Sequence, residues 1–259
     1  MNPDPLVDRL RAAGCVFAEE EAALLVDAAD GTALEELVRR RVAGEPLEHV
    51  LGWVAFAGLR VAVAPGVFVP RRRTTHLVDV AAGVTPPGGT VVDLCCGTGA
   101  IGLAVATRVP GVVLHAVDVD PAAVACARDN LAGLGTAYAG DLVAPLPADL
   151  RGRVDVMTAN VPYVPDDAVA QMPADSRDHE PRTTVAGGPD GLDVLRRVAT
   201  LAADWLTPGG RLLSEVSAGQ GPAALAVLRD AGLSAALDHG EEYDATVVVG
   251  IAAAPRALC

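Results

Sequence analysis

The feature that most constrains this chain is an apolar strand that runs directly into a glycine-rich turn and then into a helix. Residues 90–94 (Thr-Val-Val-Asp-Leu) are β-branched and apolar, which predicts a buried strand. Gly97 and Gly99 follow, and glycine allows backbone angles and close approaches that a side chain forbids. Residues 100–106 predict a helix whose N-terminus favours the polar groups of a ligand. This order predicts an α/β sheet with a ligand loop at the strand end.

A second apolar strand, residues 112–117, ends at Asp118. Its distance from Gly97 suits one strand-helix-strand step, and its carboxylate can accept hydrogen bonds from both hydroxyls of a ribose. A nicotinamide-binding loop is the alternative, since Gly97, Gly99 and Gly102 are spaced as in its G-x-G-x-x-G pattern. Asp93, Cys95 and Cys96 occupy positions where nicotinamide-binding loops usually have no such distinctive residues, which disfavours that alternative.

The order Asp-Leu-x-x-Gly-Thr-Gly at residues 93–99 resembles the first motif of the class I S-adenosylmethionine-dependent methyltransferases. The resemblance implies a Rossmann-like α/β fold with a seven-stranded, mostly parallel sheet. It implies S-adenosylmethionine as cofactor and S-adenosylhomocysteine as product, without a metal. The family's adenine-side loop corresponds to residues 140–142, after a short strand at 136–139. The cofactor-binding residues that it implies are Asp93, Cys95, Gly97, Gly99, Asp118, Val119, Asp141, Leu142 and Asn160.

A second motif, Asn160-Val161-Pro162-Tyr163, follows another predicted strand at residues 153–159. Ligands of open α/β sheets bind at the carboxyl ends of strands. An amide nitrogen is a poor nucleophile, so a site that methylates it must hold both N–H groups with acceptors. The Asn160 oxygen and the Val161 carbonyl are two such acceptors, because Pro162 restricts Val161 to extended geometry. Tyr163 offers a ring face for a flat amide. An Asx turn that only ends the strand is the alternative.

This motif resembles the Asn-Pro-Pro-Tyr signature of amino-group methyltransferases, which act on adenine in DNA or glutamine in proteins. The resemblance implies that Asn160, Val161, Pro162 and Tyr163 are the catalytic residues. Val161 departs from the signature, where the family has proline. Because the role of this position is carried by a backbone carbonyl, the change is compatible with activity.

Nearly the whole chain resembles the protein glutamine methyltransferases of the release-factor type. The resemblance implies that Arg71, Tyr163, Glu180 and Pro181 bind the substrate. It rests on residues 41–52, 56–59, 65–71, 180–182, 187–192 and 208–216, and on Gln220.

One segment departs clearly from the family. After Pro70-Arg71 the family usually has Pro, an acid, Thr and Glu, whereas this chain has Arg72, Arg73, Thr74 and Thr75. Two carboxylates near the expected mouth of the site are therefore missing. This indicates a divergent branch, whose protein substrate is a release factor or another translation-related protein. A solvated basic turn at residues 71–73 is the alternative.

Composition restricts the remaining classes. The net charge is −13 and all 20 basic residues are arginine, which argues against a surface that tracks phosphates. The five cysteines form no C-x-x-C pair, so neither a disulfide framework nor a zinc site is indicated. No basic leader or membrane-spanning run is present, which predicts a cytoplasmic protein without a membrane partner. We expect a monomer.

Helical periodicity predicts a small helical substrate-recognition domain at residues 1–52, for which a capping bundle without a partner is the alternative. A hairpin and linker are expected at 53–73, with its turn at Ala57-Gly58, and the catalytic domain at 74–259, closing with two strands within 232–251. Three functions stay open: a methyltransferase for protein glutamine, one for adenine in nucleic acid, and a non-catalytic protein that binds the cofactor.

Overall fold

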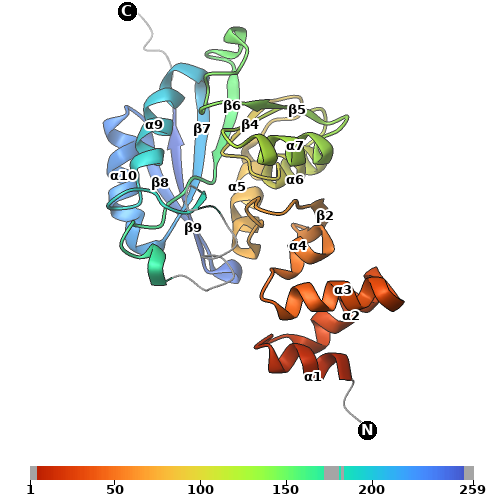
Figure 1. Cartoon of the computed structure of the whole chain (residues 1–259). Coiled ribbons are helices and arrows are strands. Elements are labelled where there is room, and N and C mark those ends of the chain that lie inside the picture. Colours follow the sequence, from red (N-terminus) through yellow and green to blue (C-terminus); the bar gives the residue numbers. More distant parts are fainter. Residues whose placement is uncertain (1–4, 172–180, 182–183, 254–259) are drawn as a thin grey trace, which may run out of the picture.

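A seven-stranded sheet forms the centre of the larger part of the molecule (Figure 1). The computed structural model describes residues 5–171, 181 and 184–253. The strand order is β5-β4-β3-β6-β7-β9-β8, and β9 alone runs against its neighbours. The predicted class of fold is therefore confirmed. The strands are β3 (Thr90–Leu94), β4 (Val113–Asp118), β5 (Gly135–Ala139), β6 (Val154–Ala159), β7 (Leu206–Val216), β8 (Ser234–Gly240) and β9 (Ala245–Ile251).

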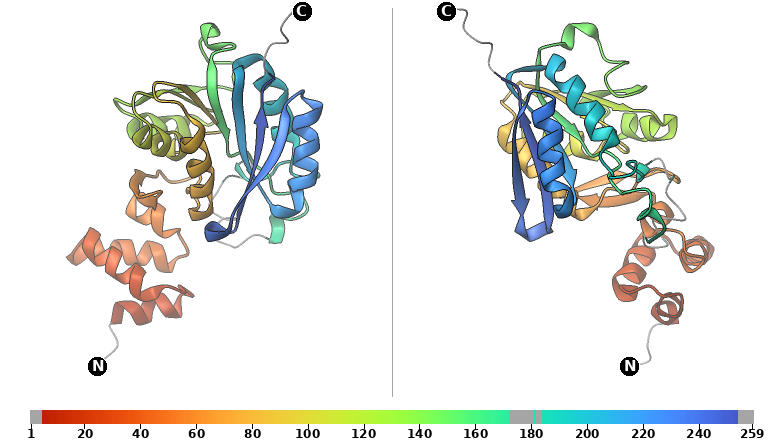
Figure 2. Two further views of the ribbon diagram at one scale, coloured as in Figure 1. Left: turned by 180° about the vertical axis from the view of Figure 1, so that it is seen from behind. Right: turned by 90° about the vertical axis from the view of Figure 1, so that its left-hand side faces the viewer.

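Helices cover both faces of this sheet, as the two views in Figure 2 show. One face carries α5 (Thr75–Val84), α6 (Ala100–Arg108) and α7 (Pro121–Asn130), and the other carries α9 (Asp193–Trp205) and α10 (Gly221–Asp230). Successive strand residues enter opposite cores, because side chains alternate across a strand. Val91 and Val156 pack in the first core, Val92 and Met157 in the second. Burial on both faces explains why these strands read as unbroken apolar runs.

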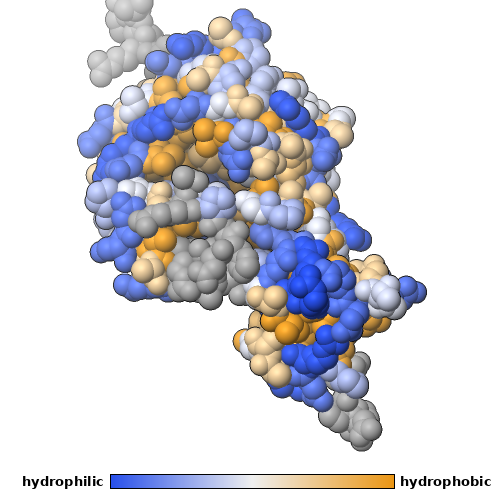
Figure 3. Space-filling view, viewed as in Figure 1, coloured by the Kyte–Doolittle hydropathy of each residue, from blue (hydrophilic) through white to orange (hydrophobic). Residues whose placement is uncertain are grey.

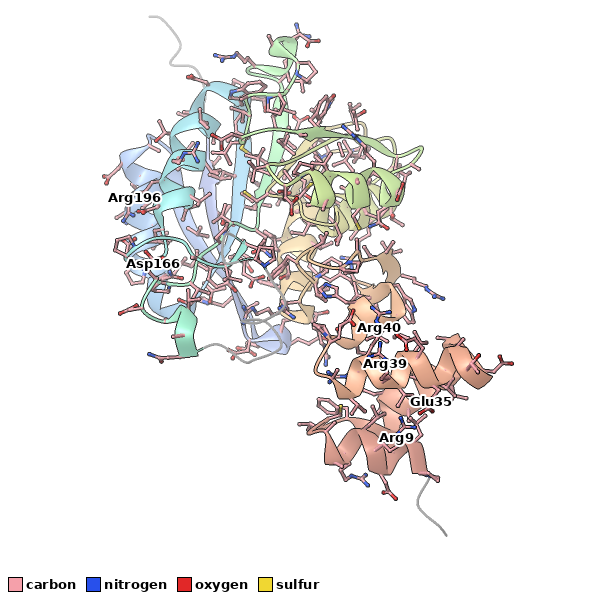
Figure 4. The ribbon with its side chains drawn as sticks, viewed as in Figure 1. Arg9, Glu35, Arg39, Arg40, Asp166 and Arg196 are labelled. Carbon is pink, nitrogen blue, oxygen red and sulfur yellow. The ribbon has the colours of Figure 1, made fainter. Side chains whose placement is uncertain are left out.

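The N-terminal helices form a separate cluster with its own small core. The cluster comprises α1 (Pro5–Ala12), α2 (Ala18–Ala28), α3 (Gly31–Val42) and α4 (Leu47–Leu51). Leu10, Leu25 and Val38 are buried within it. Arg9 on α1 pairs with Glu35 on α3 at 2.7 Å (Figure 4). The short fourth helix, α4, begins directly after Pro46.

A β-hairpin connects the helical cluster to the part of the chain that contains the seven-stranded sheet. It consists of β1 (Trp53–Phe56) and β2 (Leu59–Ala62), and Ala57 and Gly58 turn with φ of 50° and 83°, as the sequence predicted. The side chain of Asn130 at the end of α7 accepts from Ala62 N and donates to Ala62 O, both at 2.9 Å. Its amide nitrogen also lies 2.9 Å from the Thr98 carbonyl. The hairpin is thus tied to the glycine-rich loop after β3.

Candidate active site

A cavity of about 740 Å³ opens at the carboxyl ends of the parallel strands. Its wall includes the loops after β3, β4, β5 and β6, the end of β7, the segment that precedes α5 and the start of α9. The structure therefore brings both sequence motifs to one space, although some sixty positions separate them. The predicted residues that line it are Arg71, Cys95, Gly97, Asp118, Val119, Asp141, Leu142, Asn160, Val161, Pro162 and Tyr163.

The loop after β3 is held by Asp118, at the end of β4. The Asp118 carboxylate accepts from Gly97 N at 2.8 Å through Oδ2 and from Asp120 N at 2.9 Å through Oδ1. Gly97 and Gly99 have φ of 53° and 76°, where a side chain would be strained, and Cys95 shares this region with φ 52°. Burial raises the pKa of Asp118, opposed by its backbone donors. A carboxylate has about four lone-pair sites, so Asp118 retains capacity for ligand hydroxyls.

Asp93, which the sequence predicts to bind the cofactor, lies beneath this loop and is not among the described residues of the cavity wall, and its hydrogen bonds support the loop from below. Its side chain is completely buried in β3. It accepts from Gly102 N at 3.1 Å and from the Thr158 hydroxyl at 2.8 Å. Burial raises its pKa to about 7, and these two donors oppose the rise. Asp93 thus joins the first turn of α6 to the neighbouring strand β6.

The other predicted residues on the cofactor side are either uncharged or held in an ion pair. Burial, together with the nearby carboxylates, raises the pKa of the Cys95 thiol to about 12, so it is a poor nucleophile. Val119 is 71% exposed at the cavity and offers an apolar surface for a flat ring. Asp141 pairs with Arg197 on α9 at 2.6 Å, and Leu142 beside it is buried. Gly99 lies at the start of α6 and is not part of the wall among the described residues.

Asn160 follows the last residue of β6. That strand end is fixed by Ser214 on β7, whose hydroxyl donates to the Ala159 carbonyl at 2.6 Å. Within the described part of the chain, the side-chain amide of Asn160 makes no hydrogen bond, although it is partly buried and lines the cavity. A half-buried amide without partners costs free energy unless a ligand or water satisfies it. The side-chain amide of Asn160 is therefore available for hydrogen bonds with a ligand in the cavity.

Tyr163 is fixed at its backbone. Its carbonyl accepts from Gln220 Nε2 at 2.8 Å, and Gln220 also donates to the Asp190 carbonyl at 3.0 Å. Gly191 packs against the Tyr163 carbonyl with φ 76°, and a Cβ there would overlap that oxygen. This contact gives a physical reason for the glycine-rich stretch at residues 187–192, which the sequence related to the family without a role.

The hydroxyl of Tyr163 is also fixed, by residues that sequence reasoning did not assign to the site. It donates to Glu215 Oε1 at 2.8 Å and is contacted by the Arg73 guanidinium. Arg73 Nε donates to the same Glu215 oxygen at 2.8 Å. Burial, and then the Glu215 charge, raise the pKa of Tyr163 well above its usual range, so the phenol stays neutral. Two features of the sequence could have identified these residues. Arg73 departs from the acidic residue that the family has at this position, and Glu215 lies in a segment that resembles the family.

The other predicted substrate-binding residues have different positions. Arg71 lines the cavity with its guanidinium 4.9 Å from the Phe68 ring centroid. Pro181 is exposed and is not among the described residues of the wall. Glu180 lies outside the described residues.

Within the described ranges, no cluster of three or more His, Cys, Asp and Glu side chains is arranged to hold a metal ion. In the same ranges, the helices are all too short or too polar to cross a membrane.

Comparison with solved structures shows the class of fold. A methyltransferase from Pyrococcus furiosus matches with a TM-score of 0.58 at 15% identity, covering 76% of this chain and 90% of that one. The 16S rRNA N2 G1207 methyltransferase of T. thermophilus matches with a TM-score of 0.56 at 20% identity, over 77% of this chain and 49% of its own. The fold is that of a class I methyltransferase.

Comparison of sequences narrows the class to a family. The methyltransferase small domain family matches residues 59–175. The release factor glutamine methyltransferase of Mycolicibacterium smegmatis is 40% identical over 218 residues, covering 82% of this chain and 77% of its own. That of Moorella thermoacetica is 38% identical over 205 residues, covering 76% and 71%. The chain belongs to the release factor glutamine methyltransferase family.

Proposed function

We propose that this protein transfers a methyl group from S-adenosylmethionine to the side-chain amide nitrogen of a glutamine in a peptide chain release factor. The observation that carries the proposal is the unpartnered amide of Asn160 on the wall shared with the glycine-rich loop. Family membership supports the same chemistry, since the relatives are named for it.

The residues around the cavity fit this donor. The Gly97 loop and Asp118 suit its ribose, and exposed Val119 and buried Leu142 suit its adenine ring. When bound, S-adenosylmethionine supplies an electrophilic methyl group on a positively charged sulfur.

The chain acts on the acceptor by placement. Asn160 Oδ1 and the Val161 carbonyl accept the two N–H groups of the glutamine amide, so that its nitrogen faces the cofactor loop. The Tyr163 ring stacks on the flat amide. No histidine occurs among the described lining residues, and the Glu215 carboxylate is held in an ion pair with Arg73, which disfavours its protonation. We propose that the proton of the methylated nitrogen leaves to water or to a carbonyl.

The N-terminal helices α1–α4 are proposed to bind the body of the release factor, with the hairpin β1–β2 as connection. Apolar side chains reach the surface of this cluster (Figure 3), where Val16 is 84% and Phe17 67% exposed. Phe17→Ser should lower transfer to the intact release factor and spare transfer to a short glutamine peptide. Leu134→Ser, at an exposed apolar site on the catalytic part, is the matched control. Equal losses on both substrates would contradict this role.

A labelling assay tests the proposed reaction. Purified enzyme and labelled S-adenosylmethionine are combined with a bacterial release factor, with DNA and RNA, or with neither. We expect label only in the release factor, mapped by mass spectrometry to one glutamine side chain. Label in nucleic acid would favour the adenine alternative, and donor binding without transfer would favour a non-catalytic protein. We further propose a cytoplasmic monomer that needs no metal, tested by cell fractionation, light scattering and transfer in the presence of a chelator.

A further inference from the structure

The acceptor side of the cavity contains a cluster of three residues, Arg73, Tyr163 and Glu215, of which only Tyr163 belongs to one of the two sequence motifs. These residues come from distant parts of the chain, namely the 3₁₀ turn Arg72–Thr74, the loop after β6 and the end of β7. All three line the cavity. The cluster therefore joins three separate elements at the place where the acceptor is expected.

The hydrogen bonds of the cluster occupy the Tyr163 hydroxyl. Its proton goes to Glu215 Oε1 and its oxygen accepts from the Arg73 guanidinium, which also lies 5.7 Å from the Tyr163 ring centroid. A hydroxyl held by both neighbours has little freedom to move, so the direction of the ring is set. The ring face is then the part of Tyr163 that remains for an acceptor.

Within the cluster, the positions of Glu215 and of the Tyr163 hydroxyl depend on the positive charge of Arg73. The Glu215 side chain is 3% exposed, and within the described residues Arg73 is its ion-pair partner. Glu215 Oε2 has no hydrogen-bond partner there. A buried carboxylate that loses its cation is strongly disfavoured. Removing Arg73 would therefore displace Glu215 and release the Tyr163 hydroxyl at the same time.

We propose that Arg73 is a positioning residue for glutamine methylation: it neutralises Glu215 and, with it, fixes the Tyr163 ring as the surface on which the acceptor amide stacks. This inference rests on the proposed function and assigns a role to the arginine that departs from the family's acidic residue. Because Arg73 acts through Tyr163, its loss should weaken acceptor binding and spare donor binding.

Steady-state kinetics with a short glutamine peptide test the proposal. Arg73→Ala should raise the peptide KM roughly three- to tenfold, the size of an aromatic stacking contribution, with unchanged donor Kd by calorimetry. Arg73→Lys retains the charge but not the planar fork, so it should restore part of the KM. Arg72→Ala, on the exposed neighbour outside the cavity wall, is the matched control and should behave as wild type. A wild-type KM for Arg73→Ala would overturn the proposal.

A double-mutant cycle separates this role from general support of the fold. In a Tyr163→Phe background, Arg73→Ala should change the peptide KM by less than about twofold, because the hydroxyl that Arg73 holds is gone. Additive effects of the two substitutions would refute action through Tyr163. If Arg73→Ala unfolds, the charge-neutral pair Arg73→Gln/Glu215→Gln replaces it, and its KM should still rise.

A measurement without turnover keeps this inference distinct from the proposed function. In ¹³C-tyrosine NMR, Tyr163 is assigned by the signal that Tyr163→Phe removes from the three tyrosines of the chain. The ¹³Cζ chemical shift of Tyr163, which responds to the hydrogen bonds and charges at its hydroxyl, should change in Arg73→Ala and stay as in wild type in Arg72→Ala. An unchanged shift in Arg73→Ala would contradict the cluster even in an active enzyme. Failure of wild type to methylate any glutamine would instead contradict the proposed function.

Discussion

The two sides of the cavity are built in different ways. On the cofactor side, carboxylates bind backbone N–H groups of the neighbouring loops and of the first turn of α6: Asp118 holds Gly97 and Asp120, and Asp93 holds Gly102. On the acceptor side, side chains from distant elements bind one another around the Tyr163 hydroxyl, and the Asn160 amide has no partner among the described residues.

The difference corresponds to what each side has to recognise. A small cofactor always has the same shape, so a loop that backbone hydrogen bonds fix in advance loses little entropy when the cofactor binds. An acceptor amide that arrives on a protein must find hydrogen-bonding groups that are still free. We therefore expect substitutions on the cofactor side to change donor affinity, and those on the acceptor side to change transfer.

The largest expected effect is on the acceptor side. Asn160→Ala removes a positioning hydrogen bond at the reacting centre, so single-turnover transfer at saturating donor should fall by roughly 100-fold or more. Donor affinity, measured by calorimetry on the same preparation, should stay as in wild type. A transfer rate near that of wild type would exclude Asn160 from the site and leave an ordinary strand-ending turn.

The corresponding change on the cofactor side is Asp118→Ala. It should weaken donor binding by on the order of 2–3 kcal/mol, because hydrogen bonds to a charged acceptor are lost. Asp118→Asn should also weaken it, since an amide nitrogen would face the N–H of Gly97 or of Asp120. Asp129→Ala, an exposed acid on α7, controls for the change in net charge. Unchanged donor affinity in a folded Asp118→Ala protein would contradict the assignment of Asp118 to the ribose hydroxyls.

Asp93 provides a test by pH. Its pKa in the folded protein is about 7, above the ordinary value of 3.8, so the folded state retains the proton longer than the unfolded chain. The contribution of Asp93 to stability is therefore largest below pH 4 and decreases as the pH rises toward 7. Asp93→Asn lacks this titration, so the difference in unfolding free energy, wild type minus variant, should fall between pH 4 and 7. Urea unfolding curves that keep a constant difference across this range would disprove it.

The smallest effect is expected for Val161→Pro, which restores the family's signature. The role proposed for this position belongs to a backbone carbonyl, and proline retains it. We expect the transfer rate to change by less than about threefold, since Pro162 already limits residue 161 to extended geometry. A large loss would show that the buried Val161 side chain, 2% exposed, shapes the acceptor side.

The sequence by itself determined those features of the protein that depend on residues close together in the chain. Strand β3, the glycine turn, α6 and β4 are contiguous, and their apolar runs, glycines and terminal acid follow from short-range sterics and burial. The hairpin turn at Ala57-Gly58 was predictable for the same reason. Asn160 could be placed at a strand end because its motif follows an apolar run.

Only the tertiary structure decided what lies opposite that motif. The sequence places Arg73 in a basic turn and Glu215 at the end of an apolar strand. Neither position indicates which residue it will contact. They meet because β6 and β7 are adjacent in the sheet while the turn at Arg73 packs at the same edge. For Asp93, the sequence predicted a cofactor-binding residue, and only the tertiary structure showed its complete burial and its hydrogen bonds to Gly102 and Thr158. Burial and long-range pairing depend on strand order, which a single sequence does not encode locally.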